Sequence, residues 1–168
     1  MQVNEKDEYR WNLLRKDSFR LVGKSIKIDN NILAQTEIPK FWNTCQRDGT
    51  FIKLISLDES PEKGLFGVIN YFEEASDGFE YLIMCISNKA IEADYVEMII
   101  PSETWAVFNC YGPVPHAIQR GWKYLNEEWV VKYPFKHSVS PEIEWYSSGN
   151  SFSKEYLSQI WIPIKEET

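Results

Sequence analysis

The sequence lacks the charge pattern that nucleic-acid-binding proteins need. Its 168 residues carry a formal net charge of −7, and lysine and arginine never form a run longer than a dipeptide. Because phosphate backbones are bound mainly by clustered basic side chains, we expect no direct binding of nucleic acid. No apolar run approaches the ~18 residues of a membrane span, and the first residues lack the pattern of a signal peptide. We therefore expect a cytoplasmic protein without membrane contact.

Cysteine and histidine are also scarce. Cys45, Cys85 and Cys110 are widely spaced and form no Cys-x-x-Cys pair, so neither a disulfide framework nor a zinc site is expected. Cys110 has no base at a recognisable motif distance, and we interpret it as a buried packing residue. His116 and His137 are isolated, and we expect no metal and no cofactor. The motifs of serine hydrolases, P-loop enzymes and dinucleotide-binding enzymes are missing as well.

Aromatic residues, in contrast, are abundant. They make up 15% of the chain and include seven tryptophans, within an overall globular composition of 43% hydrophobic and 26% charged residues. A chain of this length fits a single domain, or two halves that share a core. The aromatic content exceeds what a core of this size needs, which makes aromatic surface a candidate binding element.

The first half of the chain predicts a strand, a helix and two further strands. Residues 1–18 are polar, and we interpret them as an extension too short for a helix-turn-helix domain. Apolar residues with helical spacing follow a first strand at 19–28, with Thr36 as a candidate N-cap and Gly49 just past the helix end. Two strands, "LFGVINYF" and "FEYLIMCIS", are then joined across an Asp77-Gly78 turn signal, which predicts a hairpin.

The second half repeats this order. A short strand, "VEMII", ends before Pro101, and the next strand, "TWAVFNCYG", leads into a helix over residues 113–133. The strands "EIEWYS" and "YLSQIWIPI" follow. Two repeats, 19–87 and 104–164, predict an α+β fold of duplicated β-α-β-β units. Their antiparallel strands would join into one sheet with two main helices packed on it.

The last two strands each combine an aliphatic face with a face of polar and aromatic groups. Alternation sends Glu142, Glu144 and Tyr146 to one side of their strand, and Gln159 and Trp161 to one side of the next. We expect these two mixed faces to coincide. They would then be either a solvated face of an antiparallel sheet, which we favour for Glu142, or the lining of a ligand site.

Glu144 is the main candidate for a polar anchor in such a lining. A carboxylate surrounded by aromatic rings suits a flat or cationic organic ligand, because ring faces attract cations and charges removed from bulk water are screened less. The same burial raises the pKa of a glutamate, which would prepare it to act as a base. Binding and catalysis therefore both remain open for this residue.

These stretches resemble the GyrI-like, or AraC-type, effector-binding family. The resemblance rests on "FRLVGKSIKI", "GLFGVINYF" with "FEYLIMCIS", "IIPSETWAVFNCYGP" leading into "AIQRGWKYLNEEW", and finally "EIEWY" and "QIWIPIK". It covers nearly the whole chain after residue 18. It implies a duplicated fold with a ligand cleft at the pseudo-twofold junction. Such a domain senses small molecules, either at the C-terminus of transcription regulators or as a domain that stands alone without a DNA-binding domain.

The resemblance also implies site residues. Glu144 matches a glutamate that meets cationic, lipophilic ligands in the family's drug-sensing members. Two positions depart from the family pattern: Gln159 stands where an acidic residue is frequent, which disfavours a mechanism with two carboxylates, and Trp105 stands where tyrosine is common. The full set of candidate ligand-binding residues is Glu144, Tyr146, Gln159, Trp161, Trp122, Tyr71, Tyr81 and Trp105. For Trp122 the helical spacing favours a place in the core over a place in the cleft wall, since it lies on the apolar face of its helix.

Three functions compete at this stage. The first is a binding domain for an amphipathic or cationic small molecule with Glu144 as anchor, which we favour over an enzyme. The second is a hydrolase of small electrophiles in which Glu144 activates water. The third is an inhibitory protein that binds a macromolecular partner through its acidic surface. A protein partner or a homodimer is compatible with each of them, and the sequence identifies neither the ligand nor the oligomeric state.

Overall fold

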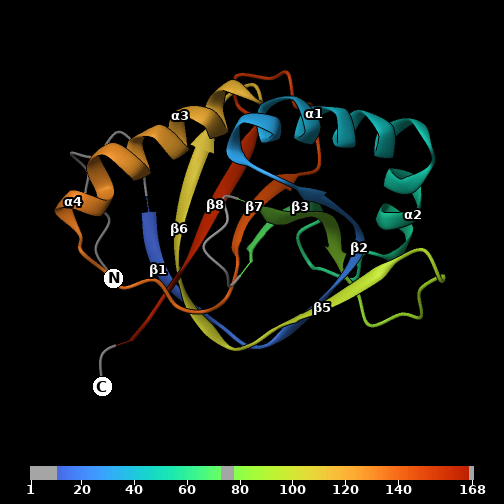
Figure 1. The fold of residues 1–168 in the computed structure, drawn as a ribbon, viewed down its shortest axis with the longest axis horizontal. Coiled ribbons are helices and arrows are strands. Elements are labelled where there is room, and N and C mark those ends of the chain that lie inside the picture. The colour runs from blue at the N-terminus through green and yellow to red at the C-terminus, as the bar shows by residue number, and fades with distance from the viewer. Residues whose placement is uncertain (1–10, 73–77, 167–168) are drawn as a thin grey trace. The chain divides into compact units, whose positions relative to one another are not determined.

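The computed structural model describes residues 11–72 and 78–166, and its elements form two compact units (Figure 1). Unit 1 combines residues 1–18 with residues 101–168, and unit 2 consists of Phe19–Ile100. The chain therefore passes from one unit to the other twice. Unit 2 is continuous in sequence, whereas unit 1 is assembled from both ends of the chain.

Unit 2 contains a four-stranded antiparallel sheet in the order β3-β4-β2-β5 and two helices. Its elements are β2 (Phe19–Ile28), α1 (Asn31–Arg47), α2 (Thr50–Leu57), β3 (Gly64–Tyr71), β4 (Phe79–Ile86) and β5 (Val96–Ile100). The predicted hairpin is confirmed as β3 and β4, although its Asp77-Gly78 turn includes residues outside the described range. Helix α2 was not predicted.

Helix α1 begins earlier than the sequence suggested. The side chain of Asn30 accepts a hydrogen bond of 2.9 Å from the Leu33 backbone N–H and thereby caps the helix. The prediction of Thr36 as N-cap was wrong, because Thr36 lies inside the helix and its hydroxyl donates to the Leu33 carbonyl. The predicted end is confirmed: Gly49, with φ of 88°, separates α1 from α2 in a conformation that favours glycine.

Unit 1 contains four further antiparallel strands, in the order β1-β6-β8-β7, and one long helical segment. Its strands are β1 (Trp11–Lys16), β6 (Glu103–Tyr111), β7 (Glu142–Ser147) and β8 (Leu157–Ile164). The helical segment comprises α3 (His116–Tyr124), the π-helical turn η1 (Leu125–Trp129) and α4 (Val130–Lys132). The Val130 N–H donates to the Leu125 carbonyl five residues earlier, as a π turn requires.

Both units have the predicted strand-helix-strand-strand order, and in each sheet the last strand of the repeat lies between the other two. The α+β fold with duplicated antiparallel units is therefore confirmed. Each sheet also gains an edge strand: β1 pairs with β6, and β5 pairs with β2. The expectation that the first strand begins at residue 19 was wrong, because Trp11–Lys16 already form β1. No helix among the described residues is long and apolar enough to cross a membrane.

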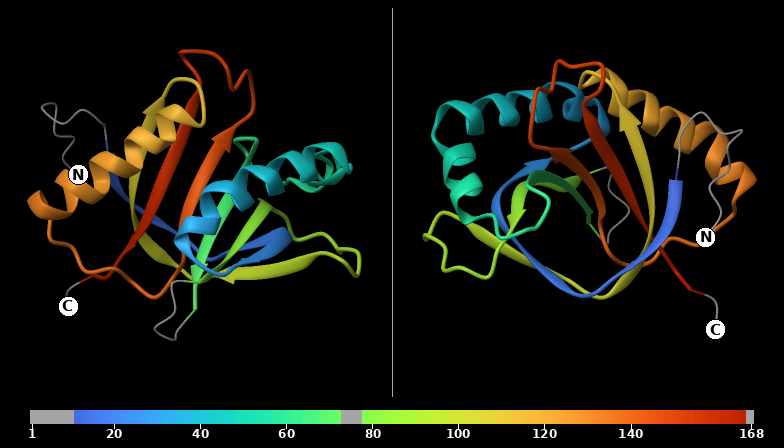
Figure 2. Two further views of the ribbon diagram at one scale, coloured as in Figure 1. Left: turned by 45° about the horizontal axis from the view of Figure 1, so that its top comes forward. Right: turned by 180° about the vertical axis from the view of Figure 1, so that it is seen from behind.

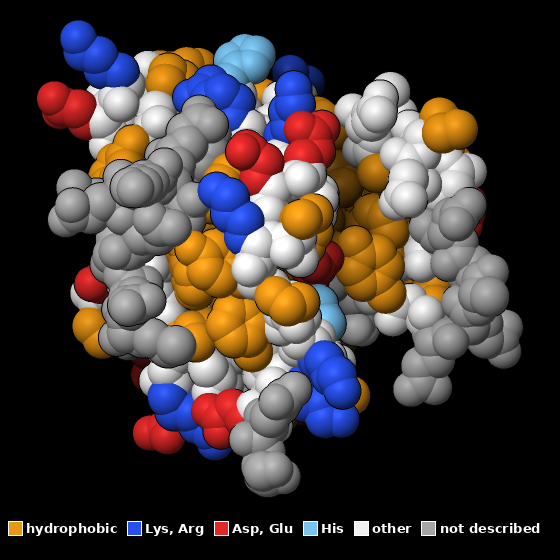
Figure 3. Space-filling model, turned by 90° about the vertical axis from the view of Figure 1, so that its left-hand side faces the viewer, with side chains coloured by type: hydrophobic (Ala, Val, Ile, Leu, Met, Phe, Trp, Pro, Cys, Tyr) orange, Lys and Arg blue, Asp and Glu red, His pale blue; other side chains and the backbone are white. Residues whose placement is uncertain are grey.

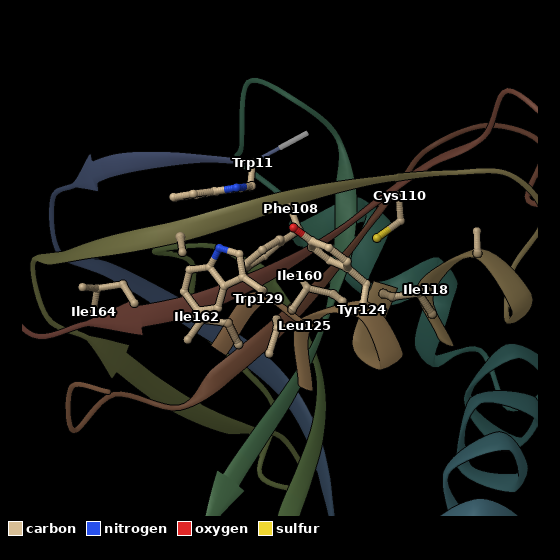
Figure 4. Packing of buried hydrophobic residues seen from close by; sticks show 12 residues of the cluster. Trp11, Phe108, Cys110, Ile118, Tyr124, Leu125, Trp129, Ile160, Ile162 and Ile164 are labelled. Atoms are coloured by element: carbon tan, nitrogen blue, oxygen red, sulfur yellow. The ribbon is translucent and has the colours of Figure 1, made fainter. Parts of the chain in front are cut away.

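The core of unit 1 lies between one face of its sheet and the helical segment. Figure 2 shows α3 running along this face, and contacts join α3 to both β6 and β8. Trp11, Phe108 and Trp129 form its aromatic part, in which the ring centroids of Phe108 and Trp129 lie 4.9 Å apart (Figure 4). Trp11 is only 4% exposed, so the polar-looking start of the chain supplies a core residue.

Replacing Phe108 tests this core. Phe108→Ala should reduce the free energy of unfolding by roughly 3–5 kcal/mol, because it removes a fully buried ring and leaves a cavity among tryptophans. Urea denaturation followed by circular dichroism measures the change. Val131→Ala is the control, since Val131 is 76% exposed, and it should change stability by no more than about 0.5 kcal/mol. Equal effects of the two substitutions would contradict the assigned core.

Candidate functional site

The carboxylate of Glu144 is buried on the face of the unit 1 sheet that carries α3. Strand register pairs Glu144 with Ile160, and directly opposed residues in an antiparallel pair point to the same side. Ile160 belongs to the core cluster beneath α3, so Glu144 points the same way. Only 9% of Glu144 remains exposed. A buried carboxylate needs polar partners to offset its lost hydration, and two aromatic side chains supply them.

Trp122 and Tyr146 hold this carboxylate. The indole Nε1–H of Trp122, on α3, donates to Oε2 of Glu144 at 2.8 Å. The hydroxyl of Tyr146, two residues along β7, donates to Oε1 at 3.0 Å. Both side chains are partly buried and pack against the core cluster, so each also remains partly exposed. We call Glu144, Trp122 and Tyr146 the carboxylate triad.

Cys110 on β6 lies near the triad within the core. It is fully buried, and its pKa is raised to about 12, first by burial and then by the negative charge of Glu144, with a smaller opposing effect from Arg120. The negative charge of Glu144 therefore disfavours the thiolate form of Cys110, which lies inside the apolar cluster of unit 1. All three cysteines are free and buried, which confirms Cys110 as a packing residue.

The register separates Gln159 and Trp161 from Glu144. Gln159 is opposite Trp145, and Trp161 is opposite Ile143, so both lie on the other face of the sheet. The expectation that they share a mixed face with Glu144 and Tyr146 was therefore wrong. There they form their own hydrogen-bonded chain: Nε1–H of Trp161 donates to Oε1 of Gln159 at 2.9 Å, and Nε2–H of Gln159 donates to Oδ1 of Asn109 at 2.8 Å.

Trp105 belongs to the same opposite face. It is fully buried, and its ring centroid lies 5.9 Å from that of Trp161. Complete burial makes it a core residue of this face, where no ligand could reach it without rearrangement of the side chains around it. The Nζ of Lys16 lies 4.6 Å from the centroid of the Trp161 ring.

In unit 2, Tyr71 and Tyr81 lie on the sheet face that carries α1 and α2, but their environments differ. Tyr81 is 1% exposed, and its hydroxyl accepts a hydrogen bond of 2.8 Å from Nε1–H of Trp42 on α1. Tyr71 is 55% exposed and packs beside Phe79. Unit 2 thus also contains a helix indole that donates to an oxygen of its sheet, although that oxygen belongs to a phenol instead of a carboxylate.

Several other charged groups form ion pairs, and one of these pairs lies beside β7. Nε2 of His137 lies 3.6 Å from Oε2 of Glu142, at the start of β7. Among the described side chains on the face in Figure 3, acidic and basic groups are interspersed, with hydrophobic side chains between them. Within residues 11–72 and 78–166, no group of three or more His, Cys, Asp or Glu side chains could hold a metal ion.

Comparison with known sequences identifies one family. The profile described as "Cass2: Integron-associated effector binding protein" matches residues 12–164, which is most of the chain. No curated protein matches the sequence.

Solved structures are similar over nearly the whole chain. A protein of Staphylococcus aureus MU50 assigned to bacterial transcription regulation is 25% identical with a TM-score of 0.81, covering 93% of this chain and 98% of that one. SAV2435 bound to tetraphenylphosphonium is also 25% identical, with a TM-score of 0.85 and coverage of 95% and 94%. The integron cassette protein VCH_CASS2 of Vibrio cholerae is 15% identical, with a TM-score of 0.71 and coverage of 92% and 95%.

Burial should make all three cysteines unreactive in the folded protein. At pH 8 a thiol with a pKa of about 12, as for Cys85 and Cys110, contains almost no thiolate, and burial raises the pKa of Cys45 as well. Ellman's reagent should therefore modify none of them in the native state and all three in guanidinium chloride. Rapid labelling of one native thiol would contradict the buried positions.

The His137–Glu142 pair should make stability depend on pH. The Glu142 carboxylate raises the pKa of His137 above its ordinary value of 6.5. The pair's contribution is therefore fully present below pH 6.5 and is lost as the pH rises through the raised pKa. Glu142→Gln should lower the free energy of unfolding more at pH 6 than at pH 9, as measured by urea denaturation. A loss of equal size at both pH values would show that the pair is not ionic.

Proposed function

Because the chain belongs to the Cass2 family of integron-associated effector-binding proteins, we propose that it binds a lipophilic organic cation at the carboxylate triad of unit 1. The predicted resemblance to GyrI-like effector-binding domains is confirmed by this membership and by the structural neighbours. The single observation that carries the proposal is the buried Glu144 carboxylate, held by an indole and a phenol.

The chemistry of the triad favours a cation over a neutral or anionic ligand. Trp122 and Tyr146 are neutral donors, so their hydrogen bonds orient the carboxylate without supplying a positive charge. A charge on a site with 9% exposure is screened less by water than a surface charge, and it attracts a cation over a longer distance. The partly exposed rings add apolar contact and a favourable electrostatic interaction between ring face and cation.

A relative supports the same class of ligand. SAV2435, at 25% identity and over 95% of this chain, has a structure bound to tetraphenylphosphonium, a cation whose charged phosphorus is surrounded by phenyl rings. Such a cation has no N–H or O–H to donate, so a site for it needs aromatic contact and negative charge instead of a precise set of acceptors. The triad offers both of these features.

The proposed site includes only some of the other predicted ligand-binding residues. Trp122 and Tyr146 belong to the site with Glu144, whereas Gln159, Trp161 and Trp105 lie on the opposite face of the sheet and are not part of it. Tyr81 is used in the core of unit 2. The exposed Tyr71 remains a predicted ligand contact. A protein partner, a homodimer and a cytoplasmic location also remain predictions.

Glu144→Gln tests the proposal directly. Glutamine keeps the shape and one acceptor oxygen for Trp122 and Tyr146 but removes the negative charge. Isothermal titration calorimetry should show saturable binding of tetraphenylphosphonium to the unmodified protein, and affinity should fall at least about tenfold in the variant because the charge attraction is lost. The neutral triphenylphosphine oxide, which lacks the positive charge, should bind both proteins alike.

The matched control is Glu155→Gln. It removes the same unit of charge from an exposed position of unit 1, and the affinity for tetraphenylphosphonium should stay within about twofold of the unmodified protein. Unchanged affinity in Glu144→Gln would exclude Glu144 as the anchor. If the unmodified protein shows no saturable binding of the cation at all, lipophilic cations are excluded as its ligand class.

A further inference from the structure

Gly121 lies in the interior of α3, immediately before Trp122, and is fully enclosed. Glycine disfavours a helix relative to alanine, so a glycine at such a position has a packing reason when nothing in the local backbone requires it. Gly121 has an ordinary helical conformation and is not among the glycines with positive φ. The reason must therefore lie in what surrounds its Cα.

Side chains from the sheet of unit 1 already fill the space in which a side chain of residue 121 would lie. A Cβ added to Gly121 would lie 2.6 Å from Sγ of Cys110 on β6 and 3.1 Å from Cδ1 of Ile160 on β8. The first distance is shorter than atoms in a core can tolerate, and both Cys110 and Ile160 are fully buried with little room to move. A side chain at this position would therefore require Cys110 to move or α3 to rise from the sheet, and the close packing around Cys110 favours the second.

We propose that Gly121 and Cys110 together form a spacer contact that sets the height of α3 above the sheet and thereby positions Trp122 to donate to Glu144. The residues around this contact adjoin two members of the triad. Gly121 precedes Trp122 in the chain, while Ile160, which also touches Gly121, is the cross-strand partner of Glu144. A lift of α3 by more than about 0.4 Å would carry this 2.8 Å hydrogen bond beyond the ordinary N–H···O range unless the indole also moved.

The geometry of the spacer contact also predicts that a second substitution can compensate for a side chain at Gly121. The Cβ of Cys110 lies 4.0 Å from the position of an added Cβ at Gly121, which is an ordinary van der Waals distance. Removing Sγ with Cys110→Ala would therefore make room for the methyl group of Gly121→Ala, and the helix could return to its original height. The two substitutions should be strongly non-additive, as expected for residues in direct contact.

The NMR signal of the Trp122 indole N–H reports whether the indole is positioned to donate to Glu144, and it does so without any ligand. In a ¹⁵N–¹H spectrum, Trp122→Phe identifies its Nε1–H signal, which we expect downfield and slow to exchange because the group donates to a carboxylate. Gly121→Ala should move the signal upfield and speed its exchange with solvent. Cys110→Ala should leave it in place, and the double variant should restore it. Gln119→Ala, on the exposed side of the same helix, should have no effect.

Three results would overturn the proposal: an unchanged Trp122 signal in Gly121→Ala, a double variant that resembles Gly121→Ala, or a displaced signal in Gln119→Ala. If Gly121→Ala does not fold, the double variant decides, because it must fold with the restored signal or the proposal is wrong. This inference rests on the proposed function only for its effect on affinity: tetraphenylphosphonium should bind Gly121→Ala roughly tenfold more weakly and the double variant nearly as well as the unmodified protein. A restored signal without any cation binding would retain the spacer contact and reject the ligand class.

Discussion

The organisation of unit 1 depends on one buried carboxylate and its two aromatic donors. Removing Glu144 from water is costly, and Trp122 and Tyr146 offset that cost with hydrogen bonds of 2.8 and 3.0 Å. One donor comes from the helix and the other from the same strand, so the interaction also ties α3 to the sheet. A purely apolar contact would hold the helix equally well, but it would leave no charge beside the rings with which to attract a ligand.

The two units use the same construction with different chemistry. In unit 2 the Trp42 indole donates to the Tyr81 hydroxyl, and in unit 1 the Trp122 indole donates to the Glu144 carboxylate. Each unit therefore contains an indole hydrogen bond from helix to sheet, but the acceptors lie on different strands of the repeat: Tyr81 is on the last strand, β4, and Glu144 is on β7, the strand before the last. Only the unit 1 version carries a carboxylate. The two hydrogen bonds therefore differ both in the strand that carries the acceptor and in the charge of that acceptor.

The reading of the candidate site from sequence was correct within a strand and wrong between strands. Alternation along β7 places Glu144 and Tyr146 on one side, and the structure agrees because side-chain direction along a strand is a local property. The relation of β7 to β8 is not local. The connection of residues 148–156 is too long to set the register, and the observed pairing of Glu144 with Ile160 moves Gln159 and Trp161 to the other face. A shift by one residue would have reversed that result.

Local patterns determined most elements of this protein: strands β2 to β8, the two helices of the repeats, the glycine after α1 and the duplicated order follow from spacing and turn residues, whereas β1 and α2 do not. The pairing of distant strands and the distances between elements were determined only by the tertiary structure. Trp11 became a core residue because β1 pairs with β6, some ninety positions away in the chain. Trp122 reaches Glu144 because of the height of α3 above the sheet. That height depends on contacts among Gly121, Cys110 and Ile160, which lie on three separate elements. Periodicity reports the direction of a side chain from its own backbone, whereas distances between elements arise only when their side chains pack against one another.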